Sequence, residues 1–320
     1  MFLRVENVCK SYNGQKVLDD ISFMVQAGEI ASLIGPSGVG KTTLLSIIAN
    51  LEAPDSGRVI FETQPSKKNP VILVFQDYTL FPNMTVFENV AFGLRARRES
   101  KTVTELKVNE LLEYFQLEHR RNHFPTELSA GQKQRVAIAR AMVVEPMLLL
   151  LDEPFANLDR NLKMDTAKFI RDTQKAFGIT TISVTHDLEE AFAMSDKIGI
   201  MIQGRLEQYD SVAQVYHRPK SMEVAGFLGP VNIIPADLME ILNIPADTVG
   251  TGQTVFARPE AIRIVPDPNG VGRVEDVVFV GHYIVYQVSI NNGRFTVYSL
   301  SNGFTAGDRV NLELRSYIVS

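Results

Sequence analysis

The stretch GPSGVGKTT, residues 35–43, decides how the first part of this chain folds. It matches the pattern G-x-x-x-x-G-K-[ST] at every fixed position, between the apolar run IASLI (30–34) and the helical pattern TTLLSIIANL (42–51). Glycines let backbone N–H groups surround phosphates, and the helix N-terminus adds a positive partial charge. We expect Lys41 to reach the terminal phosphates and Thr42 to ligate Mg²⁺. The predicted nucleotide-binding residues here are Gly35, Pro36, Ser37, Gly38, Val39, Gly40, Lys41, Thr42 and Thr43.

Four short apolar runs predict a largely parallel sheet enclosed by helices. They are IASLI (30–34), VILVF (71–75), MLLLL (147–151) and TISVT (181–185). Continuous apolarity over about five residues, without alternation, suits strands that are covered on both faces. The sequence therefore predicts an α/β fold of the P-loop type.

Polar or glycine-rich residues follow each of these runs. The phosphate loop follows the first run, Gln76 the second, Asp152 and Glu153 the third, and His186 the fourth. Because ligands in open α/β sheets lie beyond the carboxyl ends of the strands, we expect one site at four strand ends.

Each of these side chains has a predicted role and a plainer alternative. Asp152 would hold Mg²⁺, and Glu153 would act as general base toward the attacking water. His186 would contact the γ-phosphate or the water, and Gln76 the Mg²⁺ or the water. Alone, the acidic pair is also typical of a helix cap, and His186 of a cap or a packed core residue.

The bulk composition is that of a globular protein with a full core. The 320 residues are 45% hydrophobic and 22% charged, and the net charge of −5 offers no basic field for nucleic acid. A single cysteine, Cys9, fits a reducing compartment. No stretch approaches the roughly 18 to 20 apolar residues of a membrane helix. We expect a cytosolic chain unless something holds it at a membrane.

The pattern changes after about residue 235. The β-rich segments EAIRIV (260–265), VEDVVFV (274–280), YIVYQVSI (283–290), RFTVYSL (294–300) and RVNLEL (309–314) follow. The NNG between two of them predicts a hairpin in which Asn-Gly supplies positive φ. We therefore predict two domains, 1–235 and 236–320, the second a small all-β barrel of the OB type.

The segment LSAGQ (128–132) predicts a second helix start suited to phosphate. Ser129 and Gln132 form a capping-box pattern, which by itself explains an ordinary helix. Gly131 is harder to explain, because glycine in a first turn costs stability and allows another group to approach the backbone. A second copy of the chain could place this turn on the exposed face of the nucleotide, in a two-fold dimer.

These motifs together resemble the ATP-binding-cassette (ABC) ATPase family over roughly residues 1–235. The resemblance implies a RecA-like core with a helical subdomain at about 77–145, and ATP hydrolysis with Mg²⁺ at two composite sites of a dimer. Ser129, Gly131 and Gln132 would act on the partner's nucleotide, and Asp159 would link the sites. Ala130 departs from the family's usual glycine. The matching motifs are GPSGVGKTT, MLLLLDEP, LSAGQ, Gln76, ANLD (156–159), His186 and the adenine-stacking Tyr12.

The importer branch of this family is the best match. FQDYTLFPNMTVFENVAFGLR (75–95) resembles the region that receives a permease helix in the polyamine, ferric-iron, sulfate and sugar importers, and the β-rich tail resembles their TOBE domain. This implies an energy-coupling subunit, peripheral at the cytoplasmic face of the membrane, working with a permease and indirectly with a periplasmic or extracellular solute-binding protein. The predicted groove residues are Tyr78, Leu80, Phe81, Pro82 and Val86.

Two questions stay open at this point. A soluble ABC ATPase acting on ribosomes or DNA is the alternative, although such proteins usually fuse two cassettes or insert coiled coils, and we expect no nucleic-acid partner. The sequence does not identify the transported solute. Polyamine or ferric iron are our first candidates, and sulfate, thiamine, phosphonate and sugars are the alternatives.

Overall fold

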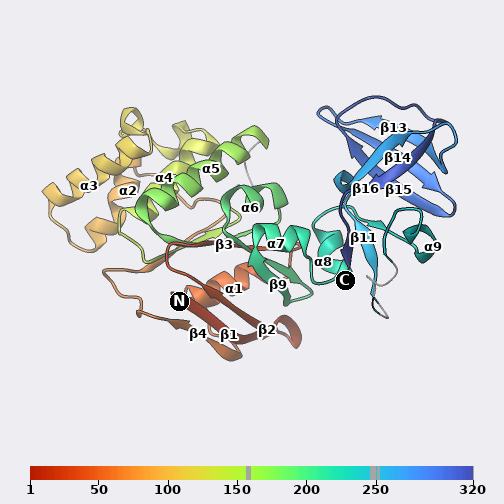
Figure 1. Ribbon diagram of the computed structural model, residues 1–320. Helices are drawn as coiled ribbons and strands as arrows, with labels where there is room; N and C mark the ends of the chain where they lie inside the picture. Colours follow the sequence, from red (N-terminus) through yellow and green to blue (C-terminus); the bar gives the residue numbers. More distant parts are fainter. Residues whose placement is uncertain (156–159, 246–249, 251–252, 320) are drawn as a thin grey trace. The chain divides into compact units, whose positions relative to one another are not determined.

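The computed structural model describes residues 1–155, 160–245, 250 and 253–319. The chain forms two compact units, Met1–Val212 and Ala213–Ser320 (Figure 1). The structure thus divides the chain earlier than residue 235, because Arg258 donates hydrogen bonds to the carbonyls of Ala225 and Gly229 and ties that segment to the second unit. The domain boundary at residue 235 stays a prediction.

A six-stranded sheet forms the centre of the first unit, in the order β5-β6-β7-β3-β8-β9. The four predicted apolar runs coincide with β3, β5, β6 and β7, and these strands pair in parallel, so this prediction is confirmed. Strand β8 continues the parallel set, and β9 closes the edge in the antiparallel sense. The strands are β3 (Ile30–Ile34), β5 (Val71–Val74), β6 (Leu148–Asp152), β7 (Thr180–Thr185), β8 (Lys197–Ile202) and β9 (Arg205–Ser211).

Burial on both faces explains why these strands are apolar at every position. Along β6, Leu148 and Leu150 pack on one face against α1 (Lys41–Ile48). Leu149 and Leu151 pack on the other face against the helical part of the unit. Successive side chains of a strand point to opposite faces, so each face needs its own apolar residues.

A second, antiparallel sheet covers the outer side of α1. Its order is β2-β1-β4, with β1 (Leu3–Tyr12), β2 (Gln15–Val25) and β4 (Ser56–Phe61). Asn13 and Gly14 turn the first hairpin with φ of 50° and 80°. The sequence patterns described above did not predict this sheet. It matters because Tyr12 is the last residue of β1.

The remaining helices of the first unit pack on the far face of the parallel sheet, where α2, α3 and α4 gather in Figure 1. Thr85 and Ser129 each begin a helix with a complete capping box, and Ser100 caps α3. These helices are α2 (Val86–Ala96), α3 (Lys101–Tyr114), α4 (Ala130–Met142), α5 (Arg160–Phe177) and α6 (Leu188–Met194). In the described ranges, no helix is both long and apolar enough to cross a membrane.

The second unit is built mainly from antiparallel strands, as predicted. The five predicted β-rich segments form one sheet in the order β12-β16-β13-β14-β15, beside a small β10-β11-β17 sheet. Its elements are α7 (Val212–His217, which begins at the last residue of the first unit), α8 (Met222–Phe227), β10 (Asn232–Ile233), α9 (Ala236–Met239), β11 (Val255–Ala257), β12 (Ile262–Pro266), β13 (Gly272–Phe279), β14 (Ile284–Ile290), β15 (Gly293–Ser299), β16 (Arg309–Leu314) and β17 (Ile318–Val319).

The predicted hairpin is present, but its glycine does not supply the positive φ. Ile290 pairs with Gly293, so Asn291 and Asn292 make the turn, and Asn291 has the positive φ of 50°. Asparagine tolerates this region because its short side chain bonds locally. Gly293 serves packing instead, since a Cβ there would come within 2.9 Å of Leu238.

Candidate active site at the ends of the parallel strands

The loop between β3 and α1 has the geometry of a phosphate cradle. Gly38 and Gly40 have φ of 79° and 101°, which L side chains rarely adopt. A Cβ on Gly35 would lie 2.2 Å from the Met201 carbonyl oxygen, and one on Gly40 would lie 2.8 Å from that of Val17. Helix α1 has no side-chain cap at its first residue, so its N–H groups stay available for an anion.

Lys41 lies inside this loop. Its side chain is only 5% exposed, and its ammonium donates to the carbonyls of Gly35 (2.7 Å) and Pro36 (2.9 Å). Burial lowers the pKa of Lys41, while the nearby charges of Glu153 and Asp152 act to raise it. The ammonium thus takes part in hydrogen bonds that a phosphate oxygen could replace.

Thr42 and Asp152 meet at the next position around the site. The Thr42 hydroxyl donates to the Asp152 carboxylate at 3.1 Å, although 110 residues separate them in sequence. Burial raises the pKa of Asp152, and the hydrogen bond from Thr42 opposes that rise. A hydroxyl and a carboxylate side by side are hard oxygen donors, which fits Mg²⁺.

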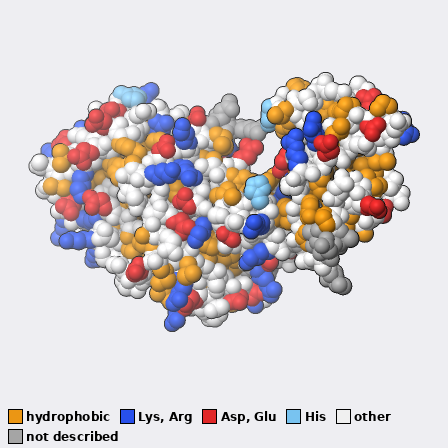
Figure 2. Space-filling model, in the orientation of Figure 1, with side chains coloured by type: hydrophobic (Ala, Val, Ile, Leu, Met, Phe, Trp, Pro, Cys, Tyr) orange, Lys and Arg blue, Asp and Glu red, His pale blue; other side chains and the backbone are white. Residues whose placement is uncertain are grey.

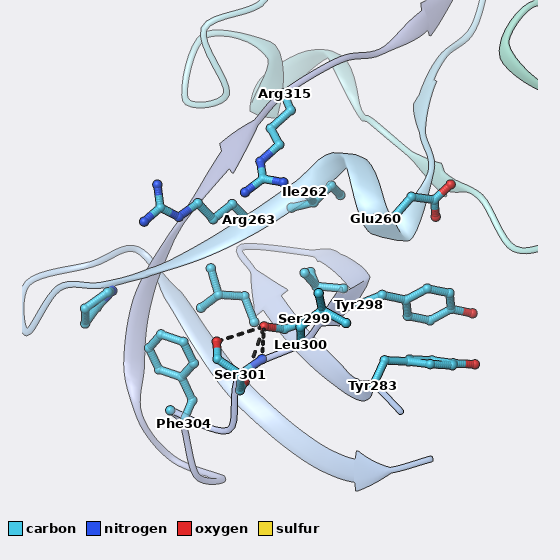
Figure 3. Close-up of a pocket in the computed structure, with 14 residues that line it drawn as sticks. Glu260, Ile262, Arg263, Tyr283, Tyr298, Ser299, Leu300, Ser301, Phe304 and Arg315 are labelled. Carbon is cyan, nitrogen blue, oxygen red and sulfur yellow. Dashed lines mark hydrogen bonds between the residues drawn. The ribbon is translucent and has the colours of Figure 1, made fainter. Parts of the chain in front are cut away.

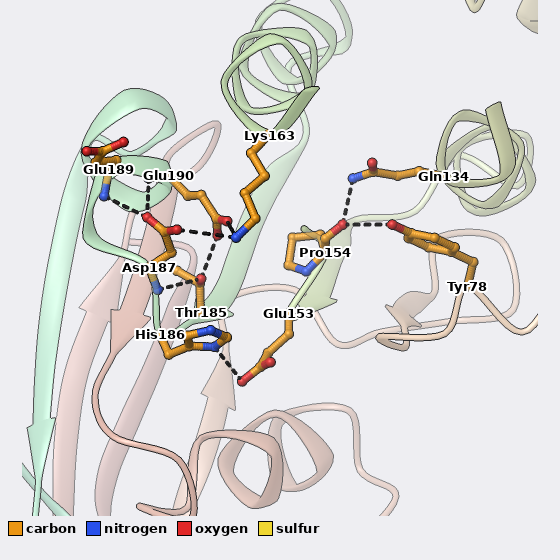
Figure 4. Close-up of polar contacts among 10 residues, drawn as sticks. All are labelled: Tyr78, Gln134, Glu153, Pro154, Lys163, Thr185, His186, Asp187, Glu189 and Glu190. Carbon is orange, nitrogen blue, oxygen red and sulfur yellow. Dashed lines mark hydrogen bonds and ion pairs between the residues drawn. The ribbon is translucent and has the colours of Figure 1, made fainter. Parts of the chain in front are cut away.

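Glu153 follows directly, in a conformation that turns its side chain away from the strand. Its φ is 44°, and its N–H donates to the Val184 carbonyl of β7 at 2.9 Å. The Glu153 carboxylate lies 3.3 Å from Nδ1 of His186, which follows β7 (Figure 4). A carboxylate and an imidazole in contact at the mouth of a phosphate loop can accept and hold a proton.

Gln76 and Tyr12 border the site from two other directions. Gln76 is exposed just beyond β5, the strand next to β6. The Tyr12 hydroxyl donates to Glu52 at 2.5 Å and also interacts with the Thr43 side chain at the start of α1. Tyr12 is 42% exposed, so its ring is accessible for stacking.

The second helix start, at α4, makes its capping hydrogen bonds within its own chain. The Ser129 hydroxyl accepts from the Gln132 N–H at 3.3 Å, and the Gln132 side chain accepts from the Ser129 N–H at 3.0 Å. Among the described residues, a Cβ on Gly131 would meet Leu162, at an ordinary 3.4 Å. Packing against the described part of the chain therefore does not require glycine there. Asp159 and the ANLD segment lie outside the described residues.

The predicted groove residues separate into two groups. Val86 is fully buried and Tyr78 is 5% exposed, because both belong to the core beneath the helices, so the structure corrects their assignment to a surface. Leu80 and Phe81 are half-buried, and Pro82 is exposed.

Several long-range contacts at this site escaped the sequence analysis. Gln134, on α4, donates to the Pro154 carbonyl at 2.8 Å. Lys163 lies 2.9 Å from Glu190 and 3.3 Å from Asp187, beside His186 (Figure 4). Nothing local distinguishes these polar residues from an exposed helix face. The one usable signal was Gln134 at the edge of an apolar helical stripe.

The second unit has a separate cavity of about 800 Å³ (Figure 3). Arg263 and Arg315 lie on one side, and the rings of Tyr283 and Tyr298, with centroids 4.8 Å apart and planes tilted by 46°, on another. Over the face drawn in Figure 2, basic and acidic side chains are interspersed. Among the described residues, no group of three or more His, Cys, Asp or Glu is placed to hold a metal by itself.

Two known domain families and several known proteins match this chain. The ABC transporter family matches residues 18–156, and the TOBE domain matches residues 255–317. The spermidine/putrescine import ATP-binding protein PotA of Nitrosospira multiformis is 39% identical, over 94% of this chain and 91% of its own length. The sulfate/thiosulfate import ATP-binding protein CysA of Xylella fastidiosa is 43% identical, over 81% of this chain and 80% of its own.

The solved structures add the fold. The dimeric post-hydrolysis state of the ATP-binding cassette MJ0796, bound to ADP and Pi, is 30% identical with a TM-score of 0.57, covering 66% of this chain and 98% of that one. Import subunits among the relatives do not favour the alternative of an ATPase that acts on ribosomes or DNA.

Proposed function

Because this chain belongs to the ATP-binding subunits of ABC transporters, in the importer type that carries a TOBE domain, we propose which residues perform each step. The protein is the ATP-hydrolysing subunit that supplies energy for import. Its substrates are ATP and water, and its products are ADP and phosphate.

ATP is held by the loop from Gly35 to Thr43, with adenine on Tyr12. Lys41 exchanges its hydrogen bonds to loop carbonyls for bonds to the β- and γ-phosphates. Thr42 and Asp152, with Gln76 from the adjacent strand end, hold Mg²⁺. When bound, this ion neutralises charge on the phosphates.

Glu153 removes the proton from the attacking water, and His186 orients that water and the γ-phosphate. The 3.3 Å contact between Glu153 and His186 supports these roles, because it brings a carboxylate and an imidazole together beyond the ends of β6 and β7. This contact is the single observation that carries the assignment of the base.

A second copy of the chain completes each site. Ser129, Gly131 and Gln132 of one copy bind the nucleotide held by the other, and Asp159 links the two sites. The room for a Cβ at Gly131, where the nearest group among the described residues is Leu162 at 3.4 Å, supports this arrangement, because a partner copy would then be the reason for glycine there. The related cassette described as dimeric supports it as well.

The permease docks on the partly exposed segment after Gln76. Leu80, Phe81 and Pro82 offer apolar surface, and Phe92 extends it, with its ring 4.5 Å from that of Phe81 and 41% exposed. Such a contact holds the subunit at the cytoplasmic face of the membrane, with the solute-binding protein acting from the other side. The relatives' names divide between polyamine and sulfate import, so the permease and the binding protein select the solute, with ferric iron, thiamine, phosphonate and sugars also open.

The test of this function is Glu153→Gln. The change removes the base and keeps the shape, so ATP should still bind and hold a dimer while turnover falls by about 1,000-fold. Glu145→Gln, at an exposed ion pair with Lys107, is the control and should leave turnover unchanged. Normal hydrolysis by Glu153→Gln would remove Glu153 from its role.

A further inference from the structure

One backbone carbonyl, that of Pro154, joins three parts of the first unit. It accepts a hydrogen bond from Nε2 of Gln134 at 2.8 Å and another from the Tyr78 hydroxyl at 3.3 Å. Figure 4 shows the two side chains approaching this oxygen together, Gln134 from α4 and Tyr78 from the loop after Gln76. Gln134 and Tyr78 are 1% and 5% exposed, so water does not compete for the oxygen.

Glu153, the residue before Pro154, needs outside support for its conformation. A φ of 44° is unfavourable for a residue with a Cβ, and such strain persists only when neighbours impose it. On one side, the Glu153 N–H is fixed to Val184 of β7. On the other side, the carbonyl of the following residue, Pro154, is held by Gln134 and Tyr78. The backbone that aims the Glu153 carboxylate is therefore clamped from both ends.

The Tyr78 end of this clamp is itself fixed to α4. The Arg140 guanidinium donates to the carbonyls of Tyr78 and Thr79, both at 3.0 Å, and these two residues have φ of 57° and 38°. Burial raises the pKa of Tyr78 to about 12, so its hydroxyl stays a donor at any physiological pH. The loop that follows Gln76, the helix that starts at Ser129 and the backbone of Glu153 thus share one hydrogen-bonded junction.

We propose that Tyr78 and Gln134 are positioning residues, which hold the general base Glu153 in place through the Pro154 carbonyl. This rests on the proposed role of Glu153. It also gives α4 and the loop after Gln76 a direct mechanical connection to the catalytic carboxylate, separate from any contact that they make with nucleotide or permease.

The test uses two nearly isosteric changes in the full chain, Gln134→Met and Tyr78→Phe. Each should lower kcat for ATP with little change in KM, since ATP binding does not involve the Pro154 carbonyl. We expect about a tenfold loss for Gln134→Met and about threefold for Tyr78→Phe, because the 2.8 Å bond is the stronger of the two. The thermal midpoint should move little for Gln134→Met, which also removes a buried amide oxygen with no partner among the described residues.

Two matched controls make the same chemical changes elsewhere in this unit. Gln174→Met removes a buried amide that donates to the Gly28 carbonyl at 2.6 Å, and Tyr209→Phe removes a buried hydroxyl with no partner among the described residues. Both should keep kcat within twofold of the parent. If Gln134→Met and Tyr78→Phe behave like these controls, the proposal is overturned. If one of them fails to fold, the other decides.

A second measurement separates positioning from a general structural effect. In the Glu153→Gln background there is no base to position, so adding Gln134→Met should cause no further loss in single-turnover hydrolysis. A repeated tenfold loss in that background would overturn the proposal while leaving the role of Glu153 intact. Full activity of Glu153→Gln alone would instead overturn the proposed function, and this inference with it.

Discussion

The two helix N-termini that we expect to bind phosphate, at α1 and α4, are built in opposite ways. Helix α1 begins after Gly40 with no side-chain cap, and backbone atoms of its own chain stand 2.2 Å and 2.8 Å from where the Cβ atoms of Gly35 and Gly40 would be. Helix α4 begins with a complete capping box at Ser129, and Gly131 has ordinary room for a methyl group.

We interpret this difference as one between a cradle that a single chain builds and a helix start that we propose completes the site of a partner. The glycines before α1 are required by the chain's own packing, so that cradle is complete in a single copy. Nothing among the described residues requires glycine at position 131, so we propose that the requirement comes from a partner copy. The same residue type thus has two causes, and only the structure distinguishes them.

The largest effect should come from Lys41→Ala. It removes the buried ammonium that now binds the Gly35 and Pro36 carbonyls, and with it the charge that faces the terminal phosphates. We expect turnover to fall by about 1,000-fold, measured as phosphate release. Lys67→Ala, an exposed lysine, is the control. Turnover near the parent level in Lys41→Ala would contradict the claim that the phosphate loop of a single chain binds ATP through Lys41.

Gly131→Ala should give the next largest effect, and should leave the monomer intact. Because the Cβ would make an ordinary 3.4 Å contact with Leu162 and no closer one among the described residues, the thermal midpoint and ATP binding by the monomer should not change. A methyl group between two copies should lower turnover by about 100-fold, because it would misplace the γ-phosphate of the nucleotide that the partner copy holds. Gly226→Ala, a helical glycine with open space around it, is the control. Unchanged turnover in Gly131→Ala would show that a partner copy does not require glycine at this position.

Tyr12→Ala should have the smallest effect. Loss of the ring removes stacking on adenine, which is worth about tenfold in ATP affinity. Tyr12→Phe loses only the hydroxyl that binds Glu52 and should retain affinity. Titration of a fluorescent ATP analogue compares the two. Equal weakening in both variants would show that the bond to Glu52, and not the ring, is what matters.

Sequence reasoning located what is local and missed what is assembled over distance. The phosphate loop, the four strand ends and the Ser129 capping box were all predictable, because each depends on spacing within a few residues. The 3.1 Å bond from Thr42 to Asp152 was expected only as a shared site, through the rule that parallel strands end at one edge.

The contacts that the sequence did not predict depend on tertiary packing. Val86 and Tyr78 were assigned to a surface but are core residues, since the helices above the sheet enclose them. Gln134 and Arg140 read as ordinary helix polar residues until the fold brings them to the Pro154 and Tyr78 carbonyls. The antiparallel sheet that presents Tyr12 was not foreseen either.

The central claim, that each ATP is held by α1 of one copy and completed by α4 of another, is tested most directly by mixing two inactive variants. Lys41→Ala and Gly131→Ala each damage both sites of their own dimers. A mixed dimer keeps one site with an intact cradle and an intact partner turn, so an equal mixture should recover roughly a quarter of the parent turnover. Turnover no higher than the average of the two separate variants would contradict the claim.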